Sequence, residues 1–378
     1  MVKKKLFLVV NVDWFFLSHR LPIAVEAIKK GFNVTVFAIE EANKGEEIKN
    51  YGLEFIPLPA SRSGTNIFQE FKVLFFLYYH YLRGKPDIVH HVAVKPVTYG
   101  SIAAKFARVP LVVNALSGLG FLFINAKENK FLNRVVTAIF KFGFKNPRIR
   151  FILQNEDDLQ MIKELNVLED DQVFLIRGSG VNLNDFYYCT PSKDEKLKII
   201  LPARMLWDKG VGEFVSSARI LYPKYKDRVE FILVGIVDME NKAGIDESQL
   251  LKWNDEGIVK WVGFQKNMVE ILKNAHIIVL PSYREGLPKS LIEACAVGRP
   301  IITTDAPGCR EVVENGVNGF LVPVQNSNDL AEKIEQLILD EVLRERMGLA
   351  GRKKAEREFS IENVIEKTFA IYGENQIE

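Results

Sequence analysis

Two acidic residues, Glu285 and Glu293, stand eight positions apart in the stretch PSYREGLPKSLIEACAVGRP, residues 281–300. Glu293 lies inside an apolar run, where a carboxylate needs hydrogen-bond donors to offset the loss of its hydration. The neighbouring hydroxyls of a ribose would supply two such donors. Pairing with a structural Arg or Lys would satisfy the same carboxylate, and the acid pair alone leaves both interpretations open.

Glu285 follows an apolar run that is typical of a buried strand, HIIVLPS at residues 276–282. The letters REG indicate a tight turn after this strand, and Pro288 is a favourable first residue of a helix. The amides at the start of that helix would form a site for phosphate. We therefore expect Glu285 at the carboxyl end of a strand, beside a phosphate site.

Two basic residues, Arg204 and Lys209, form a second candidate cluster in ARMLWDKG, residues 203–210. They lie five positions apart across a predicted turn, where both could reach one diphosphate. Arg would offer a planar fork of donors and Lys a point charge. Either residue alone would be explained by a solvated surface, but the two together after a strand favour a functional site.

The elements that must position these side chains alternate between strand and helix patterns along the whole chain. This alternation is typical of βαβ units with parallel sheets. The predicted strands are KLFLVVN, FNVTVFAI, LEFIPLP, DIVHHV, PLVVNAL and RIRFILQ in the first half, and LKIILPA, VEFILVG, IVKWVGF, HIIVLPS and PIITTD in the second.

The alternation restarts near RGSGVNLNDF, residues 177–186, whose glycines suit a turn between domains. We predict two Rossmann-like, doubly wound α/β domains, residues 1–182 and 183–358. A C-terminal helical segment, residues 359–378, is predicted to cross back and pack on the first domain. Because ligands of such sheets bind at the carboxyl ends of the strands, the cleft between the domains is the expected active site.

Composition and missing motifs argue against several classes of protein. The chain has 378 residues, of which 48% are hydrophobic and 26% charged, as in globular proteins. It lacks a GxGxxG motif after the first strand of either half and a GxxxxGK[ST] loop, which argues against dinucleotide oxidoreductases and P-loop NTPases. Its five histidines form no HExxH and no clear DxD follows a strand, so we predict no metal site and no cofactor.

The expected location follows from the cysteines and the apolar runs. Cys189, Cys295 and Cys309 form no CxxC pair, so a reducing cytosol is expected. No run approaches the roughly 18 apolar residues that span a bilayer. The start MVKKKLFLVVNVDWFF is interrupted by Asp13 and lacks a cleavage site, so we interpret it as a buried first strand rather than a signal peptide.

Charge is distributed unequally between the two halves. Residues 1–180 hold 24 Lys and Arg against 17 Asp and Glu, whereas the remainder holds 26 against 31. The basic excess is concentrated in residues 127–150, where aromatic residues are interleaved, as in helices that bind anionic membranes. A second aromatic helix, residues 68–85, could lie beside it or simply pack on the sheet. The predicted membrane contacts are Lys130, Arg134, Lys141 and Lys145.

Four stretches together resemble one protein family. ARMLWDKG, the spacing from Glu285 to Glu293, PGCREVVENGVNGFLVP (307–323) and GSGVNLNDF (178–186) look like glycosyltransferase family 4, whose members have the GT-B fold. The similarity covers essentially the whole chain. Within the family, the chain most resembles the PglA-type bacterial enzymes, which add a hexosamine to an undecaprenyl-diphosphate-linked sugar.

The resemblance implies a role for each residue of the two clusters. Arg204 and Lys209 would bind the donor diphosphate and replace a metal ion, and Glu285 would hold hydroxyls of the donor sugar. Glu293 would bind ribose. Further nucleotide-sugar contacts would come from the residues that begin the following helix, from the turn against which the base would lie, and from a glycine that closes the pocket: Gly286, Leu287, Pro288, Lys289, Val262, Phe264, Gln265 and Gly235.

The acceptor side is less well marked by the sequence. Many relatives have a glycine-rich turn after the first strand, whereas this chain has NVDWFFLSHRLP. His19 and Arg20 are candidate acceptor contacts, although His19 could equally be an ordinary residue at the start of a helix. His90 and His91 alternate on a predicted strand, so one should point inward and the other toward the cleft. His91 and Lys95 are therefore further acceptor candidates.

The implied activity is a retaining, metal-independent glycosyl transfer. The donor would be a UDP-sugar carrying an N-acetylhexosamine such as GalNAc or FucNAc. The acceptor would be a polyprenyl-diphosphate-linked saccharide of O-antigen, capsule or glycoprotein glycan assembly. The resemblance places such an enzyme in the cytoplasm, bound peripherally to an anionic inner membrane surface, without a nucleic-acid partner.

Two alternatives remain at this point. UDP-sugar 2-epimerases share the two-domain fold and need neither an acceptor nor a membrane, and they would convert UDP-GlcNAc alone into UDP-ManNAc. A non-catalytic protein of the membrane surface is the other alternative. It would have no reason to keep Arg204, Lys209, Glu285 and Glu293 together.

Overall fold

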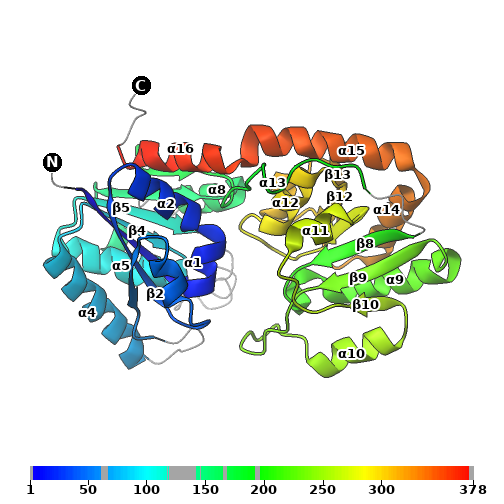
Figure 1. The fold of residues 1–378 in the computed structure, drawn as a ribbon, viewed down its shortest axis with the longest axis horizontal. Helices are drawn as coiled ribbons and strands as arrows, with labels where there is room; N and C mark the ends of the chain where they lie inside the picture. Colours follow the sequence, from blue (N-terminus) through cyan, green and yellow to red (C-terminus); the bar gives the residue numbers. More distant parts are fainter. Residues whose placement is uncertain are drawn as a thin grey trace. The chain divides into compact units, whose positions relative to one another are not determined.

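The structure is a computed structural model that describes residues 3–60, 67–116, 118, 142–144, 146–164, 168–191 and 196–373. The chain forms two compact α/β units (Figure 1). The first consists of Met1–Ser179 with Glu362–Glu378, and the second is Gly180–Ile361. The roles expected for the domains, acceptor binding and donor binding, stay predictions.

The first unit contains a seven-stranded parallel sheet with the order β3-β2-β1-β4-β5-β6-β7. Its central strands are almost continuously apolar because helices cover both faces of the sheet. The strands are β1 (Lys5–Val12), β2 (Asn33–Ile39), β3 (Glu54–Pro57), β4 (Ile88–Val92), β5 (Leu111–Leu116), β6 (Ile149–Leu153) and β7 (Val173–Leu175).

The described helices of this unit include the crossover connections between its strands. They are α1 (Asp13–His19), α2 (Leu21–Lys29), α3 (Gly45–Lys49), α4 (Ile67–Gly84), α5 (Val94–Ala107), α8 (Glu156–Glu164), the short helix η1 (Asp170–Gln172) and the C-terminal α16 (Ile361–Ile371). The side chains Leu77 and Tyr81 of α4 join Phe7 and Phe151 of the sheet in one buried cluster.

Helix α16 completes the first unit although it comes from the other end of the chain. Phe369 packs edge-on against Phe32, which immediately precedes β2. Tyr372, just beyond the helix, bonds through its hydroxyl to Nδ1 of His90 on β4 at 2.6 Å. Helix α16 therefore belongs to the same compact unit as the N-terminal half of the chain.

The second unit contains a six-stranded parallel sheet with the order β10-β9-β8-β11-β12-β13. The strands are β8 (Leu197–Pro202), β9 (Val229–Val234), β10 (Val259–Trp261), β11 (Ile277–Leu280), β12 (Ile301–Thr304) and β13 (Gly319–Val322). One buried cluster contains Phe214 and Leu250, and a second contains Leu291 and Phe359. Helices therefore pack on both faces of this sheet.

Several helices of the second unit matter for the site because they begin near the carboxyl ends of its strands. The described helices of the whole unit are η2 (Trp207–Lys209), α9 (Val211–Tyr225), α10 (Glu247–Asp255), α11 (Met268–Lys273), α12 (Lys289–Val297), α13 (Cys309–Val312), α14 (Ser327–Leu339), α15 (Glu341–Lys354) and the π-helical η3 (Ala355–Phe359). Pro288 is the N-cap of α12 rather than its first helical residue, one position from the prediction.

The α/β class predicted from the sequence is confirmed, and every predicted strand overlaps a strand of the structure. The sequence missed β7 and β13, because three or four residues are too few to show a period. It also missed α1. The buried carboxylate of Asp13 explains the acid in the apolar N-terminal run, because it accepts hydrogen bonds from the backbone amides of Ala42 and Lys44.

Candidate active site

The predicted donor residues all follow strands of the second sheet at the same edge. Arg204 lies two residues after β8, Gly235 directly after β9, and Val262 directly after β10. Glu285 lies in the loop between β11 and α12. Because these strands are parallel, their carboxyl ends meet at one edge, which is where doubly wound sheets bind ligands.

Lys209 and Glu285 form the central ion pair of this edge. The Lys209 Nζ donates to Oε1 of Glu285 at 2.5 Å, and 16% and 14% of the two side chains are exposed. A charge-assisted bond of this kind is strong, yet the remaining exposure leaves both groups accessible to a ligand. The sequence placed these residues in separate clusters, and the structure brings them together.

Two close backbone approaches hold this pair in place. Gly210 ends the turn of Lys209 with φ +72°, and a Cβ there would lie 2.2 Å from the carbonyl oxygen of Pro281. Gly308 has φ +76°, and its Cβ would lie 2.4 Å from the carbonyl oxygen of Glu285. Only glycine tolerates such contacts. The backbone N of Tyr283 also donates to the carbonyl of Asp208 at 2.9 Å, so the two loops form one rigid support.

Arg204 is paired with an acid that the sequence analysis missed. Its Nη1 donates to Oδ2 of Asp238 at 2.5 Å, with the Arg204 side chain 37% exposed and Asp238 buried. Asp238 lies in the loop after β9, next to the backbone bond between Met205 N and the carbonyl of Ile236. An acid three residues after the predicted strand VEFILVG was the available signal.

Glu293 is buried on α12, and Lys289 lies one turn earlier on the same helix. Lys289 Nζ is 3.4 Å from Oε1 of Glu293. Burial raises the pKa of Glu293, and the charge of Lys289 opposes that shift. The pairing with a structural Lys, which the sequence left open, is therefore present. It does not occupy every hydrogen-bonding position of the carboxylate, because an ionised carboxylate can accept about four bonds.

The start of α12 lies between the two acids. The first backbone amides of an α-helix have no partners within the helix and carry partial positive charge. Gly286, Leu287 and Pro288 connect Glu285 to this helix start, and Leu287 and Pro288 are buried. The loop therefore sets a positive helix end beside the pair of Lys209 and Glu285.

The turn after β10 forms the next part of the same edge. Val262 N donates to the carbonyl of Leu233 at 3.0 Å, and Gln265 Nε2 donates to the carbonyl of Val262 at 2.8 Å. Gly235 N donates to the carbonyl of Gly263 at 2.9 Å, and a Cβ on Gly235 would collide with the Ala203 carbonyl. The ring of Phe264 is 69% exposed, so it is available to stack on a flat ligand group.

The acceptor candidates are His19, the last residue of α1, and Arg20, which joins α1 to α2. The His19 ring stacks on Phe15 at 4.2 Å, and its Nδ1 is 2.6 Å from the hydroxyl of Ser18. Arg20 is only 4% exposed, and burial lowers its pKa to about 10. Its Nε has no hydrogen-bond partner among the described residues. Their acceptor role stays a prediction.

His91 is enclosed by the first unit rather than open to a ligand. Its Nε2 is 2.9 Å from the hydroxyl of Tyr81, and its Nδ1 is 2.8 Å from Oδ1 of Asn114. His90 is buried as well, because β4 is an interior strand with helices on both faces. The expectation that strand alternation exposes one of the two histidines was therefore wrong, and the acceptor role of His91 gains no support.

Lys95 lies on the first turn of α5 and pairs with Glu70 of α4 at 2.8 Å. Just before this helix, Ala93 has φ +76° and ψ 163°, a conformation that side-chain-bearing residues rarely adopt. Lys95 thus sits at the carboxyl edge of the first sheet, and its acceptor role stays a prediction. The predicted membrane contacts Lys130, Arg134, Lys141 and Lys145 lie outside the described residues.

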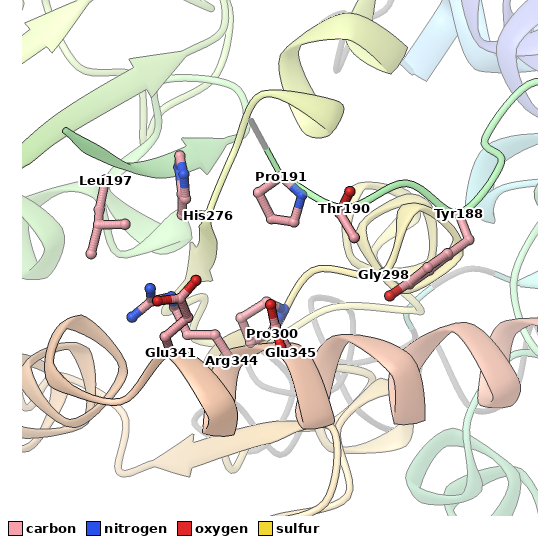
Figure 2. A pocket seen from close by; sticks show the side chains of 10 residues that line it. All are labelled: Tyr188, Thr190, Pro191, Leu197, His276, Gly298, Pro300, Glu341, Arg344 and Glu345. Atoms are coloured by element: carbon pink, nitrogen blue, oxygen red, sulfur yellow. The ribbon is translucent and has the colours of Figure 1, made fainter. Parts of the chain in front are cut away.

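A separate cavity of about 490 Å³ lies at the opposite edge of the second sheet (Figure 2). Leu197, His276 and Pro300, which line it, stand at the amino ends of their strands. Nδ1 of His276 accepts from the backbone N of Lys198 at 3.1 Å, so this side chain joins the starts of β11 and β8. None of the predicted site residues lines this cavity.

The described residues also bear on metal binding and on membrane spanning. No group of three or more His, Cys, Asp or Glu side chains there is arranged to hold a metal ion. In the same parts of the chain, no helix is long and apolar enough to cross a bilayer.

Comparisons with known proteins identify the family of both units. Residues 5–156 match the family described as "Glycosyl transferase 4-like". Residues 190–354 match the family described as "Glycosyl transferases group 1". The two matches correspond to the sheet of each unit in turn.

Two curated relatives have named activities. The N,N'-diacetylbacillosaminyl-diphospho-undecaprenol alpha-1,3-N-acetylgalactosaminyltransferase of Campylobacter jejuni is 33% identical over 350 residues, covering 87% of this chain and 90% of the relative. The UDP-Gal:alpha-D-GlcNAc-diphosphoundecaprenol alpha-1,3-galactosyltransferase of Escherichia coli is 27% identical over 333 residues, covering 83% of this chain and 82% of that enzyme.

Solved structures show the same fold at low sequence identity. HepE from Anabaena, in complex with UDP and glucose, superposes with a TM-score of 0.77 at 18% identity, covering 98% of this chain and all of that one. Sucrose-phosphate synthase from Thermosynechococcus elongatus also has a TM-score of 0.77 at 18% identity, covering 98% of each chain. From the two family matches and the relative at 33% identity, the chain belongs to glycosyltransferase family 4, with the GT-B fold.

Proposed function

We propose that this glycosyltransferase moves an N-acetylhexosamine from a UDP-sugar to a saccharide carried on polyprenyl diphosphate. The names of the C. jejuni and E. coli relatives support such an acceptor, because both contain an undecaprenol-diphosphate-linked sugar. The names of the two relatives differ in the transferred sugar, which is N-acetylgalactosamine for the first and galactose for the second. The hexosamine in this proposal therefore rests on the more similar relative, the C. jejuni enzyme. Surface glycan assembly is the proposed setting, with the enzyme bound peripherally at the inner face of the cell membrane.

The observation that carries the proposal is the ion pair of Lys209 and Glu285 beside the start of α12. In the free enzyme each charge neutralises the other. A bound UDP-sugar would offer Lys209 a diphosphate and Glu285 the hydroxyls of the sugar, so both groups would exchange their partner for the donor. The site then binds opposite ends of one substrate.

The proposed chemistry is retention of anomeric configuration without a covalent enzyme intermediate. As the bond from the sugar to the diphosphate breaks, negative charge builds on the leaving phosphate oxygen, which takes the proton of the acceptor hydroxyl on the same face. Lys209, Arg204 and the first amides of α12 would stabilise that charge. Two fixed cations would supply the charge that a metal ion supplies in other enzymes, so we propose metal-independent transfer.

Glu293 would bind the ribose of the donor. The carboxylate accepts hydrogen bonds from both ribose hydroxyls only when it is ionised, and burial works against ionisation by raising its pKa. Lys289 opposes that shift, so it would act as a positioning residue for the nucleotide. The exposed ring of Phe264 would stack on the base.

The test is an incubation of the enzyme with UDP-GalNAc, UDP-GlcNAc or UDP-galactose and a short-chain polyprenyl-diphosphate sugar. We expect a product heavier by one sugar in mass spectrometry, with an α-anomeric linkage by NMR and unchanged yield in EDTA. A second arm gives the enzyme UDP-GlcNAc alone. Formation of UDP-ManNAc there would establish the epimerase instead, an activity that the transferase relatives do not favour.

A further inference from the structure

Helix α4 carries a row of large apolar side chains on its outer face. Phe71, Phe75, Tyr79 and Leu82 are 55%, 64%, 52% and 46% exposed. Their spacing of four, four and three residues places them along one side of an α-helix. Scattered apolar residues are normal on a protein surface, but a continuous row of this kind indicates an interaction surface. We refer to these four residues as the α4 stripe.

The α4 stripe is not needed to hold the helix on its own unit. The opposite side of α4 buries Val73, Leu77 and Tyr81 against the sheet, each no more than 6% exposed. The helix therefore has a complete inner face in addition to the stripe. The outer side of α4 is therefore apolar although it makes no contribution to that inner face.

Basic side chains border the stripe. Lys72 and Arg83 are exposed and project to one flank of it, and Arg83 Nη1 donates to the hydroxyl of Tyr79 at 2.7 Å. At the end of the helix, Lys5 Nζ donates to the carbonyl of Gly84 at 2.8 Å. The acid within α4, Glu70, is paired with Lys95. The outer face of α4 is therefore aromatic and positively charged.

We propose that the α4 stripe docks on an anionic lipid surface. Aromatic rings and leucine would enter the boundary between head groups and acyl chains, while Lys72 and Arg83 would contact the phosphates. A second copy of the chain fits this face less well, because the acid of its own α4, Glu70, is already paired with Lys95 and would not match Lys72 and Arg83. The inference rests on the membrane part of the proposed function and extends it by naming residues of α4.

The test measures binding of the full chain to vesicles of phosphatidylethanolamine with phosphatidylglycerol, and to vesicles of phosphatidylcholine alone. One variant combines Phe71→Gln, Phe75→Gln and Leu82→Gln, which leaves Tyr79 and its bond to Arg83. A second combines Lys72→Gln and Arg83→Gln. The matched control combines Ile220→Gln and Leu339→Gln, exposed apolar residues of the second unit. Circular dichroism and thermal unfolding establish that each variant is folded.

The wild type and the control should bind the anionic vesicles, and salt should weaken that binding. Loss of the stripe should lower affinity at least about tenfold, because three apolar side chains stay in water. Loss of the two charges should lower it about fivefold for each charge. Wild-type affinity in the stripe variant overturns the proposal. So does a dimer, seen by analytical ultracentrifugation, that the stripe variant abolishes.

Transfer assays separate this inference from the proposed function. The stripe variant should use a water-soluble short-chain acceptor at the wild-type rate and lose rate only with an acceptor embedded in vesicles. If the wild type transfers sugar to neither acceptor, the proposed function fails. The vesicle-binding result still decides the docking surface in that case, because it does not depend on turnover.

Discussion

The ion pairs at the edge of the second sheet and the polar cluster beneath α16 differ in whether each cation has a carboxylate partner. In the second unit, Lys209 and Arg204 each have a carboxylate partner, and part of each side chain is exposed. Beneath α16, Arg20 is almost fully buried and has no carboxylate partner among the described residues. Tyr372 and His90 are its polar neighbours.

The ion pairs of the second unit can exchange their carboxylate partner for a ligand, whereas the cluster beneath α16 holds that helix in place. A partly exposed ion pair can release its acid and take a phosphate, because the ligand restores the charge balance at little cost in desolvation. Burial raises the pKa of Tyr372, so its hydroxyl stays protonated and forms a neutral hydrogen bond with Nδ1 of His90. That bond ties the C-terminal helix to the centre of the first sheet.

The largest effect is expected from breaking the exchangeable pairs. Arg204→Ala or Lys209→Ala should lower turnover at least a hundredfold, because one preorganised donor to a developing charge contributes about 3–4 kcal/mol. Steady-state kinetics with the donor and a short-chain acceptor measure this. Lys224→Ala removes another Lys–Glu pair of the same unit, on its exposed surface, and should leave turnover unchanged. Near-normal turnover in both Arg204 and Lys209 variants would remove their proposed roles.

A smaller effect is expected from acid on the buried histidines. Burial lowers the pKa of His91 to about 4 and that of His90 well below its usual range, with Arg20 adding to the shift of His90. The unfolded chain therefore binds more protons below pH ~6.5. The stability from each histidine is complete above that pH and is lost as pH falls toward 4, by up to about 1.4 kcal/mol per pH unit.

Urea unfolding of the wild type and of His90→Gln at pH 7 and pH 5 tests this dependence. Gln keeps an acceptor for Tyr372 but cannot be protonated in this range, so the variant should lose less stability between the two pH values. Equal losses in the two proteins would show that His90 is not held neutral by the fold.

The smallest effect is expected from Tyr372→Phe. This change keeps the ring against Phe369 and removes the hydrogen bond to His90, at a cost of about 0.5–1.5 kcal/mol. Hydrogen exchange should become faster at the amides of α16, while those of α12 in the second unit keep their wild-type rates. Turnover with soluble substrates should change little. Unchanged protection of α16 would mean that the hydroxyl does not secure the helix.

Much of the fold was accessible from local patterns. The strands were predictable because each is a short β-branched run bounded by turn residues, and the parallel sheets followed from the helices between them. Glu285 and Arg204 could be placed at carboxyl ends of strands for the same reason. The short strands β7 and β13 have too few residues to show such a pattern, and α1 follows β1 directly, so no turn separates the two elements.

The partners of the charged residues could not be predicted, because each contact joins segments far apart in the chain. Lys209 and Glu285 are 76 residues apart, and Arg204 and Asp238 are 34 apart. Only the order of the strands decides which loops become neighbours. The burial of Arg20 and His91 was missed for a related reason, since alternation along one strand says nothing about helices that cover both faces.

Composition, periodicity and motif spacing were sufficient for the class of fold and the positions of most strands, and they selected the candidate site residues, because these depend on neighbours in the chain. The pairing of those residues, the return of α16 and the exposure of the α4 stripe required the tertiary structure. They depend on which surfaces meet after the sheets have formed, and that is settled by packing over the whole unit rather than by any local run of residues.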